Sequence, residues 1–92
     1  MTRRYARRER VLWRRSGDAV VLLPADGSQV FTLEGSGVDL WQLLAEPIAL
    51  DEAARALADA YGTSSDEVAA DIAPVLEELS RRDVIEAHEP GA

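Results

Sequence analysis

Side chains that could do chemistry are few and scattered in this sequence. His88 is the only histidine, it lies close to the end of the chain, and there is no cysteine. A catalytic site needs a nucleophile with a base, a carboxylate pair in a cleft, or clustered metal ligands, but the acidic residues are spread along the chain. Gly35-Ser36-Gly37 lacks the spacing and the lysine of a phosphate-binding loop. We therefore expect no enzymatic activity, no cofactor and no metal site.

Length and composition predict one small intracellular domain. Ninety-two residues suit a single domain with a modest core. No run approaches 18 apolar residues, and Met1-Thr2-Arg3-Arg4 leads into more arginines rather than into an apolar signal region. We expect a cytoplasmic protein with no membrane partner, and the lack of cysteine excludes disulfides.

Charge is distributed unevenly along the chain. Residues 1–15 hold seven arginines against Glu9, whereas residues 16–92 hold three arginines against sixteen acids, so that +6 and −13 give the net charge of −7. Residues 1–9 show no apolar period and are predicted to be a flexible arginine-rich arm, which is either a solvated tail or a segment that docks on an acidic partner or on this chain's own acidic body. The acidic remainder argues against nucleic acid as a partner.

The first third of the chain predicts a three-stranded antiparallel meander. Val11-Leu12-Trp13 begins the first strand, and the apolar run Ala19–Leu23 is typical of a central strand flanked on both sides. Asp26-Gly27 is a strong hairpin signal, and residues 28–33 alternate well enough to form the third strand. Nothing strand-like follows until a short closing segment at Val84-Ile85, so the third strand is expected to lie at an open edge.

Three helices are predicted to follow the meander. The first begins near Ser36, with a weak capping box to Asp39, and carries Trp41 as a core anchor. The second covers residues 51–61 and ends at Gly62 in the left-handed conformation. Its predicted buried stripe comprises Ala53, Leu57 and Tyr61.

The third helix opens at Ser64, where Glu67 completes a capping box, and Pro74 is expected to kink or break it. Its apolar face comprises Val68, Ile72, Val75, Leu76 and Leu79. The predicted fold is α+β and winged-helix-like, with a domain over residues 10–86 and a tail over 87–92.

An open strand edge beside an apolar helix face predicts a site for an extended peptide. The edge offers unpaired N–H and C=O groups, and the helix offers pockets for side chains. The candidate site residues are Gln29, Val30, Phe31, Thr32 and Leu33 from the strand, and Val68, Asp71, Ile72, Val75 and Glu78 from the helix. Phe31, Leu76 and Leu79 are assigned mainly to the core, whereas Asp71, Glu77 and Glu78 could pair with basic peptide residues.

Two other functions fit the same order of elements. A winged-helix DNA-binding regulator would read the groove with the third helix, but residues 64–83 carry a net charge of −4, from six acids and two arginines, which opposes phosphate approach. A structural or oligomerising interaction domain would use the same strand edge between copies, which leaves a monomer or a weak homodimer open.

Several stretches of the chain resemble the PqqD family. They are Gly17–Leu23, Val30–Gly37 running into Leu40–Leu44, Leu50–Ala53 continuing to Ala60–Gly62, and Val68–Leu79, which together span roughly residues 10–86. Each motif is weak alone, but their order and spacing are fairly specific. Glu34 departs from the asparagine that is frequent at this point in the family.

The resemblance implies a RiPP recognition element, a non-catalytic module that binds the leader of a ribosomally made precursor peptide. In such modules the leader adds as a strand beside the third strand and rests against the third helix. The implied partners are the precursor peptide and a RiPP maturation enzyme, such as a radical SAM enzyme or the leader protease of a lasso-peptide pathway. The chain is similar to the stand-alone type, so we expect no fused enzyme domain.

Overall fold

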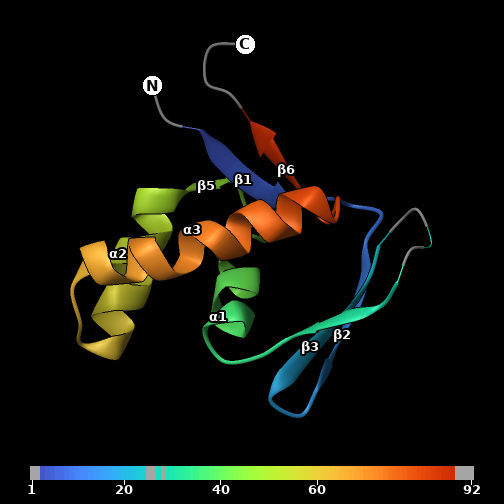
Figure 1. The fold of residues 1–92 in the computed structure, drawn as a ribbon, viewed down its shortest axis with the longest axis horizontal. Helices are drawn as coiled ribbons and strands as arrows, with labels where there is room; N and C mark the ends of the chain where they lie inside the picture. The colour runs from blue at the N-terminus through green and yellow to red at the C-terminus, as the bar shows by residue number, and fades with distance from the viewer. Residues whose placement is uncertain (1–2, 25–26, 28, 89–92) are drawn as a thin grey trace.

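The computed structural model describes residues 3–24, 27 and 29–88 and shows two small antiparallel sheets around three helices (Figure 1). The elements in chain order are β1 (Arg4–Arg7), β2 (Leu12–Ser16), β3 (Ala19–Leu23), β4 (Phe31–Leu33), α1 (Ser36–Leu43), β5 (Ile48–Ala49), α2 (Leu50–Tyr61), α3 (Ser65–Arg81) and β6 (Ile85–His88). The predicted α+β class, with antiparallel strands and three helices, is confirmed.

The first sheet is the predicted meander, with strand order β2-β3-β4. Leu22 of β3 lies opposite Trp13 of β2 and Phe31 of β4, so these three side chains share one face. Val20 and Leu22 are buried, whereas Val21 is half-buried and Leu23 is exposed. β3 is the central strand with β2 and β4 on either side, as predicted, but only one of its faces is buried. Its apolar run is longer than its buried face because the helices cover one side of the sheet only.

The second sheet, with order β5-β1-β6, corrects the prediction of a flexible arm. Arg4–Arg7 form its central strand, and Ala6 in that strand is buried. The arginines form ion pairs with acids that are distant in sequence: Arg4 lies 3.3 Å from Glu52, and Arg8 lies 3.0 Å from Asp83. Local charge and periodicity could not reveal this strand, because its hydrogen-bonding and ionic partners come from the other end of the chain.

The predicted tail is also shorter than expected. Ala87 and His88 belong to β6, which pairs with β1 along its whole length. Residues 89–92, the rest of the predicted tail, lie outside the described residues. The short closing segment expected at Val84-Ile85 is therefore a longer strand, and it completes a sheet separate from that of β4.

The capping residues predicted from the sequence agree with some of the observed helix ends and not with others. Ser64 Oγ accepts the Glu67 N–H at the start of α3 as predicted, and Gly62 ends α2 at φ 69°. The Ser36 capping box does not form, because α1 starts one residue earlier than a Ser36 cap would require and Gly35 takes the cap position. Pro74 does not break α3, which runs as one helix from Ser65 to Arg81.

The core lies between the helices and one face of each sheet. Trp41 is fully buried as predicted. Tyr61 corrects the predicted stripe of α2, since it is 47% exposed and its hydroxyl hydrogen-bonds Asp39 instead. The largest fully buried side chains are Trp41, Leu22, Leu40, Leu44, Ile72, Leu79, Ile85, Val20 and Val84. No helix within the described residues is long and apolar enough to cross a membrane.

Arg7 of β1 contacts both β2, in the other sheet, and α1. Its guanidinium carbon lies 4.7 Å from the centre of the Trp13 ring and 4.8 Å from that of Trp41. Its Nε and Nη2 donate to the Trp41 carbonyl at 2.8 and 2.5 Å. This carbonyl lies in the last turn of α1, where carbonyls lack helical donors and a cation is favoured. Partial burial lowers the pKa of Arg7, which nevertheless stays charged.

Candidate functional site: a groove between β4 and α3

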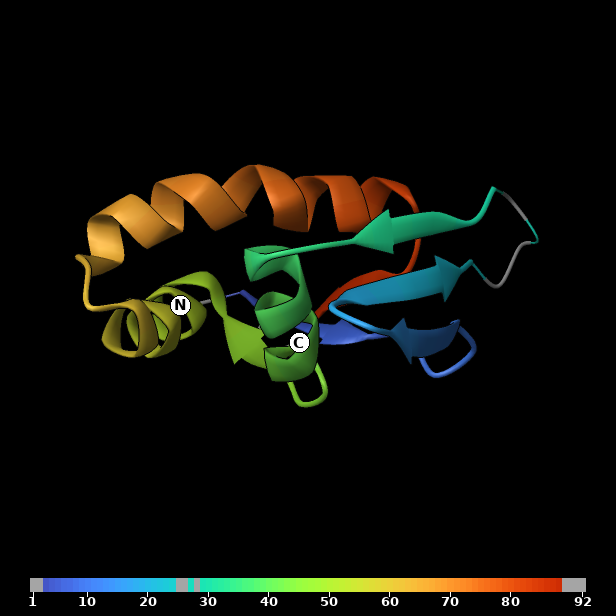
Figure 2. The ribbon, with the colours of Figure 1, turned by 90° about the horizontal axis from the view of Figure 1, so that it is seen from below.

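The candidate site is a groove of about 370 Å³ between β4 and the C-terminal half of α3. Figure 2 shows β4 running beside this part of the helix. The groove is lined by Phe31, Thr32, Leu33, Pro74, Val75, Glu78, Leu79 and Arg82. A three-residue strand segment thus faces two turns of helix.

The edge of β4 that borders the groove is open. β4 pairs with β3 on one side, and no strand among residues 3–24, 27 and 29–88 pairs with its other side. The N-terminal and C-terminal strands, which could have covered this edge, instead pair with each other in the second sheet. Unpaired backbone groups of an edge strand can template an added strand.

The floor of the groove is apolar and only partly covered. Phe31, Leu33 and Val75 are half-buried and pack against the core, and Leu79 is buried beneath them. Pro74 is exposed and has no N–H to donate. A guest side chain in this groove would therefore cover carbon atoms on both sides, and such burial supplies most of the free energy of peptide docking.

A cluster of charged side chains closes one end of the groove. The Arg82 guanidinium carbon lies 4.5 Å from the centre of the Phe31 ring, and Arg82 Nε donates to Glu78 Oε2 at 2.8 Å. Arg81 Nη2 donates to the other oxygen of Glu78 at 2.6 Å. These hydrogen bonds, from Arg81 first and from Arg82, lower the pKa of Glu78. Glu78 is thus already paired within the chain, whereas the sequence predicted only that it could pair with a basic residue of a peptide.

The structure brings half of the candidate residues together. Phe31, Thr32, Leu33, Val75 and Glu78 line the groove. Val68 and Ile72 are buried in the core instead, because they lie on the stripe of α3 that faces α2 and the sheets. Gln29, Val30 and Asp71 are exposed and lie outside the lining.

Three lining residues were not in the predicted set. They are Pro74, Leu79, which was assigned to the core, and Arg82. Val75, Glu78, Leu79 and Arg82 recur at i, i+3, i+4 and i+7, which is the spacing of one helix face. This second stripe, offset from the core stripe, is the signal in the sequence that could have found Arg82.

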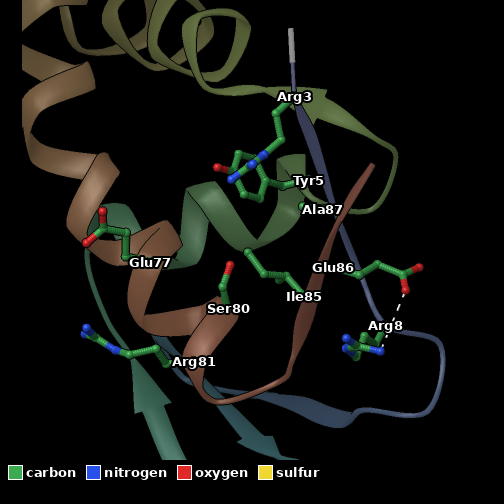
Figure 3. Close-up of a pocket in the computed structure, with 9 residues that line it drawn as sticks. All are labelled: Arg3, Tyr5, Arg8, Glu77, Ser80, Arg81, Ile85, Glu86 and Ala87. Carbon is green, nitrogen blue, oxygen red and sulfur yellow. Dashed lines mark ion pairs between the residues drawn. The ribbon is translucent and has the colours of Figure 1, made fainter. Parts of the chain in front are cut away.

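A second hollow of about 460 Å³ lies between β6, β1 and the C-terminal half of α3 (Figure 3). It is lined by Arg3, Tyr5, Arg8, Glu77, Ser80, Arg81, Ile85, Glu86 and Ala87. Arg8 pairs across the hollow's rim with Glu86 at 3.8 Å, and it also pairs with Asp83. Although this hollow is larger, its floor is less apolar, and a guest would compete with existing ion pairs. We therefore place the candidate site at β4.

Fold and groove together define a small α+β module with one strand edge open beside a helix. Residues 19–85 match the family described as Coenzyme PQQ synthesis protein D (PqqD). The chain belongs to this family, and the predicted resemblance is confirmed.

Two solved structures share the fold. TbiB1, in complex with the TbiA(beta) leader peptide, is 26% identical, with a TM-score of 0.78, and the match covers 88% of this chain and 94% of that one. The PqqD truncation of Methylobacterium extorquens PqqCD, described as a functional and stand-alone RiPP recognition element, is 24% identical, with a TM-score of 0.75 and coverage of 90% and 88%. A search of curated proteins gave no match.

Proposed function

We propose that this chain is a RiPP recognition element that binds the leader of a precursor peptide and presents the peptide to a maturation enzyme. The leader adds as a strand to the open edge of β4, and its side chains enter the groove against α3. The observation that carries the proposal is the unpaired β4 edge directly beside an apolar groove. Membership of the PqqD family and the similarity to TbiB1, which binds a leader peptide, support it.

Backbone pairing alone is too weak to hold a leader here. Ordering a peptide costs about 1–2 kcal/mol per residue, whereas each hydrogen bond returns a net of about 0.5–1.5 kcal/mol. β4 offers only three residues. Buried anchor side chains, at about 1.5–3 kcal/mol each, must therefore supply the surplus and the selectivity. The groove floor of Phe31, Leu33 and Val75 is where such anchors would be buried.

Charge on α3 favours a leader with a basic residue next to its apolar anchors. Asp71 lies one turn before Val75 on the helix face that continues through Glu78 and Arg82, at i, i+4, i+7 and i+11. Its carboxylate is exposed. Since Glu78 is already paired with two arginines, Asp71 is the better partner for a cation of the leader, where it would raise the association rate and set the register.

Hydrogen exchange tests the proposal directly. The probe is the leader of the precursor peptide encoded near the gene for this chain, titrated into the isotopically labelled protein. Strand addition should slow exchange of the outward-facing β4 amides within Phe31–Leu33 and shift the resonances of Val75 and Leu79. The matched control is β2, the other edge of the same sheet, whose exchange should not change. Saturable leader binding that leaves the β4 amides unprotected would refute strand addition at this edge.

A further inference from the structure

The β2 strand carries a second exposed surface, distinct from the groove. Every residue of β2 is exposed, including Leu12 at 67% and Trp13 at 43%. Figure 1 shows that the β2–β3 hairpin projects away from the helices, and among the residues that the structure describes β2 pairs with β3 alone, on one side. We define the hairpin surface as Leu12, Arg14 and Leu23, whose side chains share one face of the hairpin, whereas Trp13 and Arg15 lie on the other face, which carries the buried Val20 and Leu22. Exposed apolar side chains beside a charged one mark a surface suited to a protein partner.

The β2–β3 hairpin and the turn before it also carry the arginines that form no ion pair within the described residues. Arg4 and Arg8 form ion pairs with Glu52, Asp83 and Glu86, and Arg7 lies against two tryptophan rings. In the described part of the chain, Arg10 and Arg14 have no ion-pair partner, and Arg15 donates only to the Gly17 carbonyl, at 3.4 Å. Residues 10–23 hold three arginines against Asp18, a net charge of +2, in a chain of net charge −7.

The positive charge of the hairpin favours an acidic partner protein over a second copy of the same strand. A second copy of the chain pairing β2 with β2 would set arginines against arginines, and like charges opposite one another destabilise a strand pair. Charged side chains on an edge strand are a common protection against such self-pairing. An acidic surface on a different protein has the complementary charge, and attraction between the two would speed their association.

We propose that the hairpin surface docks the maturation enzyme through an acidic patch around an apolar centre. This inference rests on the function proposed above, because it assigns the enzyme to a second edge of the leader-binding sheet. A leader strand added to β4 would lie three strand spacings, about 14 Å, from β2. One small sheet would thus hold the peptide at one edge and the enzyme at the other, so that the segment following the leader starts near the enzyme.

The experiment measures both partners on the same variants of the full chain. The probes are the maturation enzyme and the leader peptide encoded near the gene for this chain, each titrated onto the immobilised protein at low and high salt. The test variant combines Leu12→Ser with Arg14→Glu, because both side chains are exposed and neither has a polar partner within the described residues. Trp13 is left in place because it contacts Arg7 and Trp41.

The double variant should bind the enzyme about tenfold or more weakly and bind the leader normally. Arg55→Glu makes the same change of charge on exposed α2 and should alter enzyme affinity by less than about twofold. High salt should weaken enzyme binding to the wild-type chain. Val75→Asp should show the converse pattern: the affinity for the leader falls, and the affinity for the enzyme does not change.

Unchanged enzyme affinity in the double variant would overturn the inference, as would a wild-type chain that binds the leader but not the enzyme. A homodimer that the double variant dissolves, or binding of a DNA duplex that Arg14→Glu abolishes, would assign the surface to another partner and overturn it too. If the enzyme binds through the hairpin surface and the leader does not bind, the proposed leader function fails while the docking surface stands.

Discussion

Val75 provides the sharpest test of the groove. Its side chain is half-buried against the core and lines the groove opposite β4. A guest peptide would cover only the part that is still exposed, so the apolar contact is worth about 1 kcal/mol, less than the roughly 1.5–3 kcal/mol of a fully buried aliphatic side chain. Val75→Ala should therefore weaken leader binding about fivefold.

Val75→Asp should have a much larger effect. It loses the same contact and also places an unpaired carboxylate beneath the guest, which costs about 1–3 kcal/mol more. The sum, about 2–4 kcal/mol, corresponds to a roughly 30- to 1000-fold increase in Kd. Fluorescence anisotropy of a labelled leader measures both variants under one set of conditions.

The matched control for this series is Ala70→Asp. Residue 70 is exposed on α3 and lies outside the groove lining, so this variant adds the same charge to the same helix without blocking the site. Thermal melting followed by circular dichroism establishes that each variant is folded. A folded Val75→Asp protein whose Kd matches that of Ala70→Asp would show that no guest side chain lies over Val75, and the groove argument would fail.

Three further outcomes follow from contacts outside the groove floor. Asp71→Lys should slow leader association and reduce its salt dependence if the leader is basic, and stopped-flow rates that match the wild type at low salt would count against this role. Arg7→Lys keeps the charge but not the paired donation to Trp41 or the ring stacking, so urea denaturation should show a loss of about 1–2 kcal/mol, and an unchanged midpoint would contradict the contact. The hydrogen bond to Asp39 raises the pKa of Tyr61 to about 12 from 10.0, so its contribution to stability is present below pH 10 and is lost as the pH rises to about 12. Tyr61→Phe should flatten the fall in melting temperature over that range, and an equal fall in both proteins would mean that other groups cause it.

Much of the architecture follows from local patterns in the sequence. The helical spacing of apolar residues predicted α3 and its buried stripe, and the Asp26-Gly27 signal with three apolar runs predicted the β2-β3-β4 meander. These patterns succeed because period and turn chemistry depend on neighbouring residues. The open edge of β4 followed from the absence of another strand signal nearby.

Contacts between residues that are distant in sequence could not be predicted from local patterns. The arginine-rich start was predicted to be a flexible arm, either solvated or docked on an acidic surface, yet it is the central strand of a second sheet. Its arginines do pair with acids of this chain's own body, Glu52, Asp83 and Glu86. The sequence likewise did not predict which side of α3 faces the groove. Val68 and Ile72 share the apolar stripe with Val75, but the packing of α2 against α3 buries the first two and leaves the third half-exposed.

By itself, then, the sequence determined which segments become the three helices and the β2-β3-β4 meander, and that one strand would end a sheet. The tertiary structure alone decided that Arg82 covers Phe31, that Glu78 pairs with two arginines, and that β1 and β6 pair with each other rather than with β4. The physical reason is that periodicity records which face of an element is apolar, whereas the neighbour against which that face packs depends on residues tens of positions away.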